Sequence, residues 1–228
     1  MSVIAASVDL RPLFGPARNQ GPRPTCLAFA ASDAHAALRP GWAPLSCEYA
    51  FYQAQRRAAR PPSTGALLSA MLAALRGDGQ PEENGWPYLA ATPTDAASWS
   101  PPAEVGPLFG RDGEKSSPAI DQVVAELDQG RPVIILMMLS RSFYMPTGQA
   151  VIDPANGEAP EHARRHAVVA VGHGAVDRQR SILVRNSWGP RWGDAGYGWL
   201  TEQFLGPRMF AAATLMEEVD VSGHSAAT

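Results

Sequence analysis

The chain has 228 residues, of which 45% are hydrophobic and 18% charged, and its formal net charge at pH 7 is −3. This length and apolar content are enough to bury a core in one large domain or two packed lobes, which excludes disorder of the full chain. The sequence has no basic excess and no apolar run approaching about 18 residues, so we expect neither nucleic acid nor a membrane as a partner.

Residues 1–9 have neither the basic start nor the long apolar region of a secretory signal. We therefore expect a cytoplasmic protein, or one exported by a route without an N-terminal signal peptide. The two cysteines, Cys26 and Cys47, do not make a disulfide framework, which fits a reducing compartment. We expect them to remain unpaired and Cys47 to be a core residue.

Helices are predicted through much of the first half, which glycine and proline divide into short elements. The helices are expected over 26–38, 46–59 and 66–76. Ser46 is placed to cap the second helix, and Gly77 to end the third in the left-handed conformation. Residues 81–113 show no sustained period and are expected to be loop. We therefore predict a mainly helical lobe over 19–113.

Strands dominate the pattern of the second half. A helix comes first, with apolar residues spaced to form one face: Ile120, Val123, Val124 and Leu127. Strands rich in β-branched residues follow over 133–139, 167–171 and 182–184. We therefore predict a mainly β lobe over 114–215, with residues 1–18 packing on it, and a frayed tail over 216–228.

Cys26 follows a turn rich in glycine and proline and opens the first predicted helix. Thr25 is placed to cap this helix, and the unpaired N–H groups and dipole of a first turn favour a thiolate over a thiol. A thiol in that position is suited to act as a nucleophile. A buried, inert cysteine is the alternative, because free cysteine is among the most buried residue types. The stretch alone leaves both readings open.

His166 opens an apolar run, and a rigid strand would hold it at a lobe face as a base for the thiol. A structural histidine is the alternative for this position taken alone. His35 lies about 900° of helix rotation beyond Cys26, roughly on the opposite face, and is expected to be structural. The remaining histidines lie in a charged loop, a glycine turn and the tail: His162, His173 and His224.

Asn186 follows the last predicted strand, in a stretch where tryptophans alternate with glycines. A strand-end amide can accept the imidazole N–H and orient the ring, which would complete a set of nucleophile, base and orienting residue. For Trp192 and Trp199 we favour a structural role, in which the rings fill a corner of the sheet and the glycines admit tight turns.

Four blocks of the chain resemble the papain family of cysteine peptidases. They are residues 19–30 around Cys26, residues 64–65 with 86–88, residues 166–172 beginning at His166, and residues 186–198 beginning at Asn186. Cys26 and His166 are 140 residues apart, within the family's usual separation of about 130–150, and Asn186 follows His166 by 20. The resemblance extends from Asp9 to about Leu205.

The resemblance implies an α+β, papain-like two-lobed fold, with a helical N-terminal lobe, a sheet- or barrel-like C-terminal lobe and the active-site cleft between them. It implies Cys26 as the nucleophile, His166 as general base and then acid, and Asn186 as the residue that orients the imidazole. Gln20 would supply a side-chain donor to the oxyanion beside the Cys26 N–H. Neither a metal nor an organic cofactor is implied.

Substrate binding is implied for Thr64, Gly65 and Trp188. Gly65 would expose backbone groups that pair with an extended peptide, and Trp188 would shield the contact between the histidine and the asparagine. Two departures from the family leave the shape of the subsites open. Leu27 replaces the usual aromatic residue after the nucleophile, and Thr64 stands where a second cleft glycine is frequent.

The leading hypothesis is an endopeptidase of the disulfide-poor kind that the resemblance associates with bacteria, acting on a peptide or protein substrate. The same thiol chemistry serves acyl transfer to an amine, in a ligase or amidase, and a catalytically weak peptide-binding module is a further alternative. An effector or toxin would share the chemistry and would be paired with an inhibitor or immunity protein. About eighteen residues precede the active-site segment, too few for the family's inhibitory propeptide. We therefore expect either that the activity is restrained by something other than such a propeptide, or that the sequence is already the mature part of a longer protein.

Overall fold

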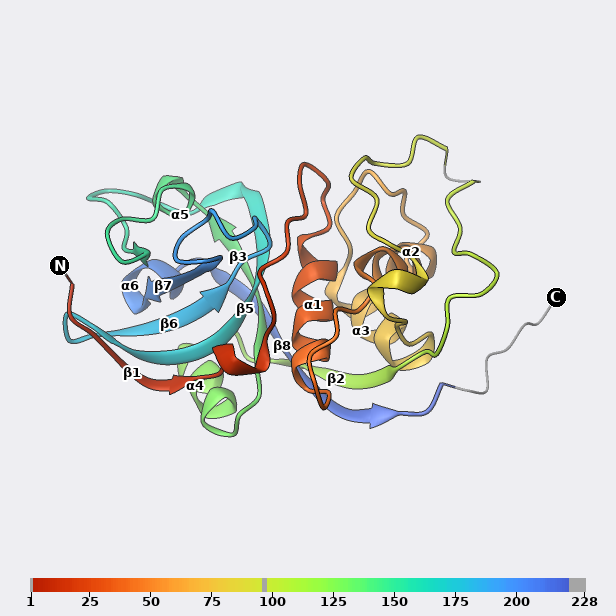
Figure 1. Cartoon of the computed structure of the whole chain (residues 1–228). Coiled ribbons are helices and arrows are strands. Elements are labelled where there is room, and N and C mark those ends of the chain that lie inside the picture. The colour runs from red at the N-terminus through yellow and green to blue at the C-terminus, as the bar shows by residue number, and fades with distance from the viewer. Residues whose placement is uncertain (1, 96–97, 222–228) are drawn as a thin grey trace. The chain divides into compact units, whose positions relative to one another are not determined.

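The computed structural model describes residues 2–95 and 98–221, and the chain divides into two compact units. The sheet unit comprises Met1–Asn19 and Lys115–Thr214, and the helical unit comprises Gln20–Glu114 and Leu215–Thr228. Figure 1 labels the elements of both, and its colours follow the chain from one to the other. Strands make up most of the regular structure in the first unit, and helices in the second.

The sheet unit is built on strands that pair in the order β8, β3, β5, β6, β7 and β4, with β1 also paired to β5. Its neighbouring strands are antiparallel except for β4 and β7, which are parallel. The strands are β1 (Ile4–Asp9), β3 (Val133–Leu139), β4 (Val151–Ile152), β5 (Glu161–Val176), β6 (Gln179–Arg185), β7 (Tyr197–Thr201) and β8 (Met209–Val219). The helical segments of this unit are η1 (Arg11–Leu13), α4 (Ile120–Asp128), α5 (Arg141–Tyr144) and α6 (Glu202–Leu205).

The 16-residue strand β5 is the centre of this sheet and carries His166. Its first five residues are exposed, and the seven that begin with His166 are buried. The strand predicted over 167–171 is therefore the buried part of a longer element. Strand β5 has a neighbouring strand on each edge. It pairs with β3, where His166 lies opposite Met137, and with β6, where Val169 lies opposite Arg185.

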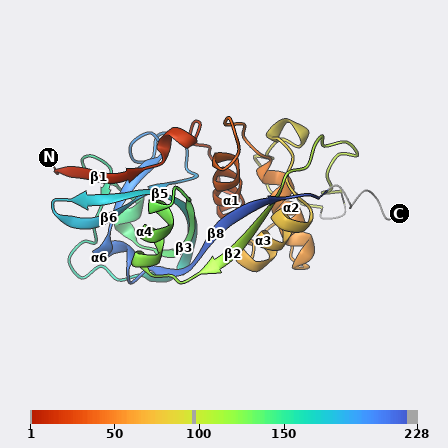
Figure 2. The ribbon, with the colours of Figure 1, turned by 90° about the horizontal axis from the view of Figure 1, so that it is seen from below.

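The core of the sheet unit lies between the sheet and α4, which Figure 2 shows lying beside β3 and β5. Ile120, Val123 and Leu127 of α4 are buried, and Val124 packs against the same apolar cluster. The predicted apolar face of this helix is therefore confirmed. Burial of this face against the sheet is what stabilises a helix of only nine residues.

Strand β1 adds the N-terminal residues to this sheet by pairing with β5, at a place where β5 carries two glycines. Asp9 lies opposite Gly172, and Ala6 opposite Gly174. A Cβ atom at Gly172 would lie 2.5 Å from the Val8 carbonyl oxygen, and one at Gly174 would be closer still to the backbone of β1. The glycines thus allow an approach that a side chain would block. Residues 1–18, predicted to pack on the β lobe, contribute a strand to its sheet.

The helical unit contains three main helices, a short helix and a strand that pairs with β8: α1 (Cys26–Ala37), α2 (Cys47–Arg57), α3 (Leu68–Gly77), η2 (Glu83–Gly85) and β2 (Gly110–Ser116). Every residue of α1 after Cys26 is buried, and its alanines allow α2 and α3 to pack closely. Ser46 caps α2 by accepting the Tyr49 N–H at 3.0 Å, as predicted. Thr25 is the N-cap residue of α1, as predicted, but its side chain makes no capping hydrogen bond.

Gly77 is the last residue of α3 and not its left-handed terminator, so this prediction is wrong. Asp78 keeps a helical conformation, and the left-handed residue is Gly79, with a φ of +67°. The space beside Gly77 is taken by Arg57, whose Nη2 would lie 2.6 Å from a Cβ at that position. Arg57 in turn pairs with Asp78 at 2.5 Å.

The predicted loop and tail both contain some regular structure. Within 81–113 lie η2 and the first residues of β2. The predicted tail over 216–228 begins as strand, since β8 extends to Val219. Residues 222–228, and with them His224, lie outside the described part of the chain. Among the described residues, no helix has the length and apolar character needed to cross a membrane.

Candidate active site

His166 and Asn186 lie side by side in the sheet unit, because Asn186 directly follows β6 and β6 pairs with β5. His166 Nε2 is 2.7 Å from Asn186 Oδ1. The same oxygen accepts the Ser187 N–H at 2.8 Å, which fixes the end of the amide that faces the ring. Because a carbonyl oxygen only accepts, Nε2 carries and donates the hydrogen, and Nδ1 presents a lone pair that can accept a proton.

Aromatic rings cover the imidazole of His166. The Trp188 ring lies 4.8 Å from it between centroids, and Phe143 meets it edge-on at 5.7 Å. Trp192 packs against Phe143 at 4.9 Å and donates its Nε1 hydrogen to the Phe143 carbonyl oxygen at 3.0 Å. Trp188 therefore covers part of the imidazole, and its shielding of the hydrogen bond between His166 and Asn186 stays a prediction.

Burial lowers the pKa of His166 to about 4, and the hydrogen bond with Asn186 raises it by a smaller amount. The imidazole is therefore neutral at pH 7, which is the form that accepts a proton. Burial also lowers the pKa of His35, to about 3, and the Nδ1 atom of this residue contacts Gln80 Oε1 at 3.2 Å. His35 has the buried, hydrogen-bonded setting of a structural histidine.

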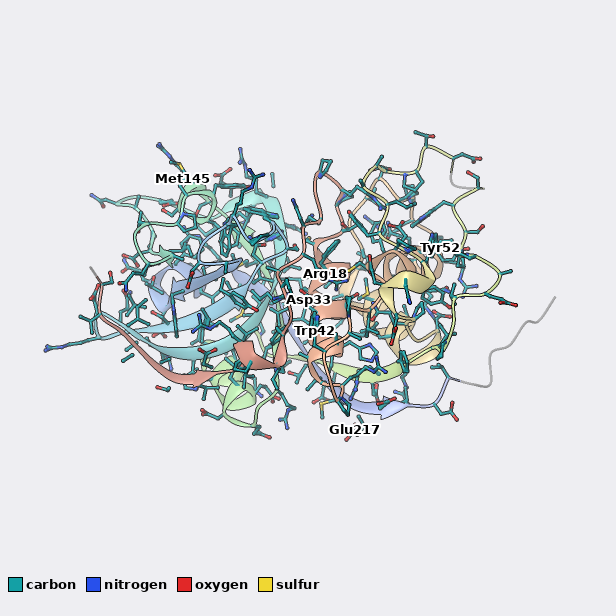
Figure 3. The ribbon with its side chains drawn as sticks, in the orientation of Figure 1. Arg18, Asp33, Trp42, Tyr52, Met145 and Glu217 are labelled. Atoms are coloured by element: carbon teal, nitrogen blue, oxygen red, sulfur yellow. The ribbon has the colours of Figure 1, made fainter. Side chains whose placement is uncertain are left out.

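The carboxylate of Glu158 holds α5, the short helix that carries Phe143. It accepts the N–H groups of Ser142 and Ala155, both at 2.8 Å, and the Ser142 hydroxyl. Burial opposes ionisation, but hydrogen bonds from the loop serines hold the pKa of Glu158 at about 2. Beyond α5 the loop turns outward, and Met145 is 64% exposed (Figure 3). Sequence reasoning missed Glu158, because its partners lie in the four-residue helix α5 and in a loop, neither of which a periodic pattern marks.

Cys26 and Cys47 each open a helix of the helical unit, and neither is in a disulfide. Cys26 is partly exposed at the start of α1, whereas Cys47 is fully buried at the start of α2. The N-terminus of α1 presents N–H groups without acceptors inside the helix and the positive end of the helix dipole, which together stabilise a thiolate. Burial gives Cys47 the character of a core residue.

Gln20 begins the thiol segment, which is the name we give to residues 20–26. Its side chain is buried, and Nε2 donates to the Arg23 carbonyl oxygen at 2.8 Å. The Thr25 N–H donates to the same oxygen at 2.9 Å, so the segment folds back on itself. Gly21 has a φ of +60°, a left-handed conformation that glycine adopts without a steric penalty. The Gln20 amide is thereby oriented relative to the start of α1.

Thr64 and Gly65 lie in the loop between α2 and α3, and Gln55 of α2 holds this loop at Pro61 and Thr64. Gln55 Nε2 donates to the carbonyl oxygens of Pro61 and Thr64 at 2.7 and 2.8 Å. Gly65 is exposed, and the nearest atom to a Cβ placed at this position would be the Pro24 carbonyl oxygen, at 3.8 Å. The backbone at Gly65 is therefore accessible. Gln55 is a supporting residue that the sequence patterns did not reveal.

The structure thus brings His166, Asn186 and Trp188 together in the sheet unit. It places Gln20 and Cys26 in the thiol segment of the helical unit. In the part of the chain that the structure describes, no three histidine, cysteine or acidic side chains gather as metal ligands would. The catalytic and substrate-binding roles of these residues stay predictions.

The sequence profile of the papain family cysteine proteases matches residues 56–207, which is more than half of the chain. The chain belongs to the papain family. The matched range contains His166 and Asn186 and begins after Cys26. Membership of the family, predicted from four short blocks, is confirmed.

Two curated relatives show how far this papain-family chain corresponds to longer proteins. A cysteine protease of Blomia tropicalis is 31% identical over 123 residues, which cover 52% of this chain and 34% of the relative. Peptidase 1 of Dermatophagoides farinae is 26% identical over 201 residues, which cover 86% of this chain and 60% of the relative. The chain spans between about a third and three-fifths of the length of these proteins.

Solved structures of papain-family proteins have the same fold. Xylellain, a cysteine protease from Xylella fastidiosa, matches with a TM-score of 0.77 at 21% identity, over 93% of this chain and 86% of that one. Procathepsin L 3 of Tenebrio molitor matches with a TM-score of 0.72 at 19% identity, over 94% of this chain and 71% of that one. The predicted papain-like α+β fold is therefore confirmed.

Proposed function

We propose that the protein is a cysteine endopeptidase that hydrolyses peptide bonds in peptide or protein substrates. The observation that carries this proposal is the 2.7 Å contact between His166 Nε2 and Asn186 Oδ1. It gives the imidazole one tautomer and one orientation, with Nδ1 as the basic atom. An oriented, neutral histidine in a papain-family chain is suited to activate a thiol.

In the proposed first step, the Cys26 thiol transfers its proton to His166 Nδ1, and the sulfur attacks the carbonyl carbon of the scissile amide. A carbon–sulfur bond forms as the carbonyl π electrons move to oxygen. The Cys26 backbone N–H and the Gln20 side-chain amide donate hydrogen bonds to this oxyanion. When the carbonyl re-forms, the carbon–nitrogen bond breaks, and His166 gives its proton to the departing amine. The product is a thioester on Cys26.

In the second step, water replaces the amine. His166 takes a proton from the water as its oxygen attacks the thioester carbonyl, and the same donors bind the second oxyanion. Collapse breaks the carbon–sulfur bond, releases the carboxylic acid and restores Cys26. Asn186 keeps the ring oriented in both steps, so the same nitrogen accepts and returns each proton.

Substrate binding is proposed at Thr64, Gly65 and Trp188. The accessible backbone at Gly65 can pair with an extended peptide chain, and the hydrogen bonds from Gln55 hold the residue before it, Thr64. Pairing through the main chain needs no particular substrate side chain, so this contact supports general affinity for peptides and leaves selectivity to other positions.

The test is cleavage of a peptide library by the purified chain, with products read by mass spectrometry. Cys26→Ala is expected to abolish cleavage and keep the fold, and Cys47→Ala is the matched control that removes the other thiol and keeps activity. Undiminished cleavage by Cys26→Ala would contradict the proposal. Adding an amine nucleophile to the same assay separates hydrolysis, which yields free acids, from acyl transfer, which yields new amides.

A further inference from the structure

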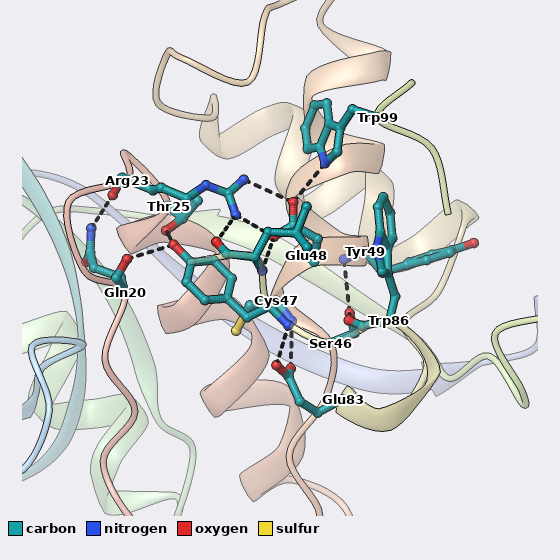
Figure 4. A network of polar contacts seen from close by, with 12 residues as sticks. Gln20, Arg23, Thr25, Ser46, Cys47, Glu48, Tyr49, Glu83, Trp86 and Trp99 are labelled. Atoms are coloured by element: carbon teal, nitrogen blue, oxygen red, sulfur yellow. Dashed lines mark hydrogen bonds and ion pairs between the residues drawn. The ribbon is translucent and has the colours of Figure 1, made fainter. Parts of the chain in front are cut away.

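The thiol segment is fixed from outside by a network of polar contacts buried in the helical unit (Figure 4). Between Gln20 and Cys26 the backbone is neither helix nor strand. Within the segment, the Gln20 side chain and the Thr25 N–H both donate to the Arg23 carbonyl oxygen. Contacts from outside the segment add a second constraint on where the Gln20 amide lies relative to the Cys26 N–H.

One hydroxyl contacts both ends. Tyr88 Oη lies 2.7 Å from the Gln20 carbonyl oxygen and 2.8 Å from Thr25 Oγ1. The carbonyl oxygen can only accept, so the Tyr88 hydroxyl donates to Gln20, and the Thr25 hydroxyl donates to Tyr88. This arrangement explains why the Thr25 side chain makes no capping bond at α1, since its hydroxyl is engaged with Tyr88. The first residue of the segment and the residue before Cys26 are thus tied to one atom.

The ring of Tyr88 is held between two elements. Phe29 of α1 meets it edge-on at 4.8 Å, and the Arg23 guanidinium lies 4.9 Å from its centre on a cation–π contact. The Tyr88 N–H donates to Glu83 Oε1 at 2.9 Å. Ring and backbone are both anchored, so the hydroxyl has a defined position and is not a mobile surface group.

A buried ion pair holds the neighbouring residue, Leu89. Arg23 and Glu48 meet at 2.5 Å with neither side chain exposed. Arg23 also donates to the Leu89 carbonyl oxygen at 2.6 Å, and Glu48 accepts the Leu89 N–H at 3.1 Å and the Trp99 indole N–H at 2.8 Å. Charges this deeply buried need compensating hydrogen bonds. Glu48 has them from Leu89 and Trp99, whereas the Nε atom of Arg23 is buried without a partner. The pair fixes the backbone next to Tyr88 to both α2 and the thiol segment.

We propose that Tyr88 is a positioning residue for catalysis: its hydroxyl sets the place of the Gln20 amide and of the residue before Cys26. It touches no substrate and no reacting atom. The inference rests on the proposed function, because it assigns Tyr88 a role in the geometry of the oxyanion donors. Donors of this kind lose much of their effect when displaced by as little as about 1 Å.

The test is Tyr88→Phe, which removes one oxygen atom and keeps the ring contacts with Phe29 and Arg23. We expect kcat to fall about 10- to 100-fold with KM changed less than about 2-fold, because the loss appears in the transition state. Tyr52→Phe is the matched control, since Tyr52 belongs to the same helical unit, packs on Trp86 and Trp99 and is expected to keep kcat (Figure 3).

A double-mutant cycle with Gln20→Ala separates positioning from general support of the fold. If Tyr88 acts through the Gln20 amide, adding Tyr88→Phe to Gln20→Ala lowers kcat by less than about 3-fold, because the donor is already gone. Full additivity, or an unchanged kcat in Tyr88→Phe, would overturn the inference while cleavage by the unmodified chain upholds the proposed function. An unmodified chain that cleaves nothing would overturn both.

A second variant covers the case in which Tyr88→Phe does not fold. Thr25→Val removes the other hydroxyl of the pair and keeps the side-chain shape. We expect it to lower kcat by a smaller factor than Tyr88→Phe, with KM again nearly constant. A folded Thr25→Val protein with the kcat of the unmodified chain would overturn the assignment by itself.

Discussion

Arg23 and Glu48 form an ion pair at 2.5 Å in which neither side chain reaches solvent. Removing two charges from water costs several kcal/mol each, and their attraction repays this only when the remaining hydrogen-bonding groups are satisfied. Glu48 meets this condition through Leu89 and Trp99. The pair therefore joins the thiol segment to α2 at a point where loss of one partner leaves an uncompensated charge.

Arg23→Met is expected to destabilise the protein by about 3–5 kcal/mol, because Glu48 stays buried without its partner. Arg23→Met combined with Glu48→Met removes both charges, and we expect most of the loss to be recovered. Urea unfolding followed by tryptophan fluorescence measures both free energies. A double variant as unstable as Arg23→Met would show that the hydrogen bonds to Leu89 and Trp99, and not the unpaired charge, dominate.

Asn186→Ala is expected to lower kcat about 10- to 100-fold, because His166 Nε2 loses its acceptor and the ring loses its fixed orientation. KM should change little, since Asn186 is not placed to touch the substrate. Steady-state kinetics on one peptide measures both parameters. Asn156→Ala, at an exposed position, serves as the control. Equal kcat values for the two variants would show that Asn186 does not orient the base.

The blocks around His166 and Asn186 could be predicted because each joins a recognisable motif to a buried, β-branched strand. The strand over 133–139 could be predicted as well, and it is β3, whereas β1 and β8 could not be. β8 is rich in alanine, methionine and glutamate, none of which favours a strand, and it becomes one by pairing with β3, where Leu136 lies opposite Ala211. β1 likewise depends on glycines of β5 that lie more than 160 residues away in the chain.

The same limit applies to the residues that support the site. Glu48 and Glu158 stand in no motif, and Tyr88 stands in the block 86–88 without an assigned role; each acts by contacts with residues that its own stretch of sequence does not specify. Which backbone N–H a buried carboxylate accepts is decided only when the chain has folded. Motifs therefore identify the residues expected to react, whereas the residues that hold them have to be found in the structure.

The pH dependence of activity follows from the burial of His166. Because its pKa is lowered to about 4, the imidazole stays neutral and able to accept the Cys26 proton until the pH falls through that value. We expect kcat/KM to be lost as the pH drops below about 4, as measured with an uncharged peptide between pH 3 and 8. In Asn186→Ala the acid limb should move lower, because the hydrogen bond that raises the pKa is removed. Loss of activity already near pH 6.5 would contradict a His166 pKa that burial has lowered.

The free energy of unfolding should also fall in mild acid, and His35 is the residue that gives the clearest test. Burial lowers its folded-state pKa to about 3, whereas an unfolded histidine titrates near 6.5. Between pH 3 and pH 6.5 the unfolded chain binds more protons at this residue than the folded chain does. The free energy of unfolding therefore keeps its full value above pH 6.5 and decreases as the pH falls toward 3. At pH 5 this one group should cost roughly 2 kcal/mol.

The measurement is the difference in urea unfolding free energy between pH 7 and pH 5. His35→Gln should show a smaller difference than the unmodified chain, whatever its stability at pH 7, because the titrating group is gone. The difference should not vanish, since His166 acts in the same direction. His162→Gln, at an exposed position of β5, should leave it unchanged. If His35→Gln and the unmodified chain lose equal stability on acidification, the loss arises from groups other than His35.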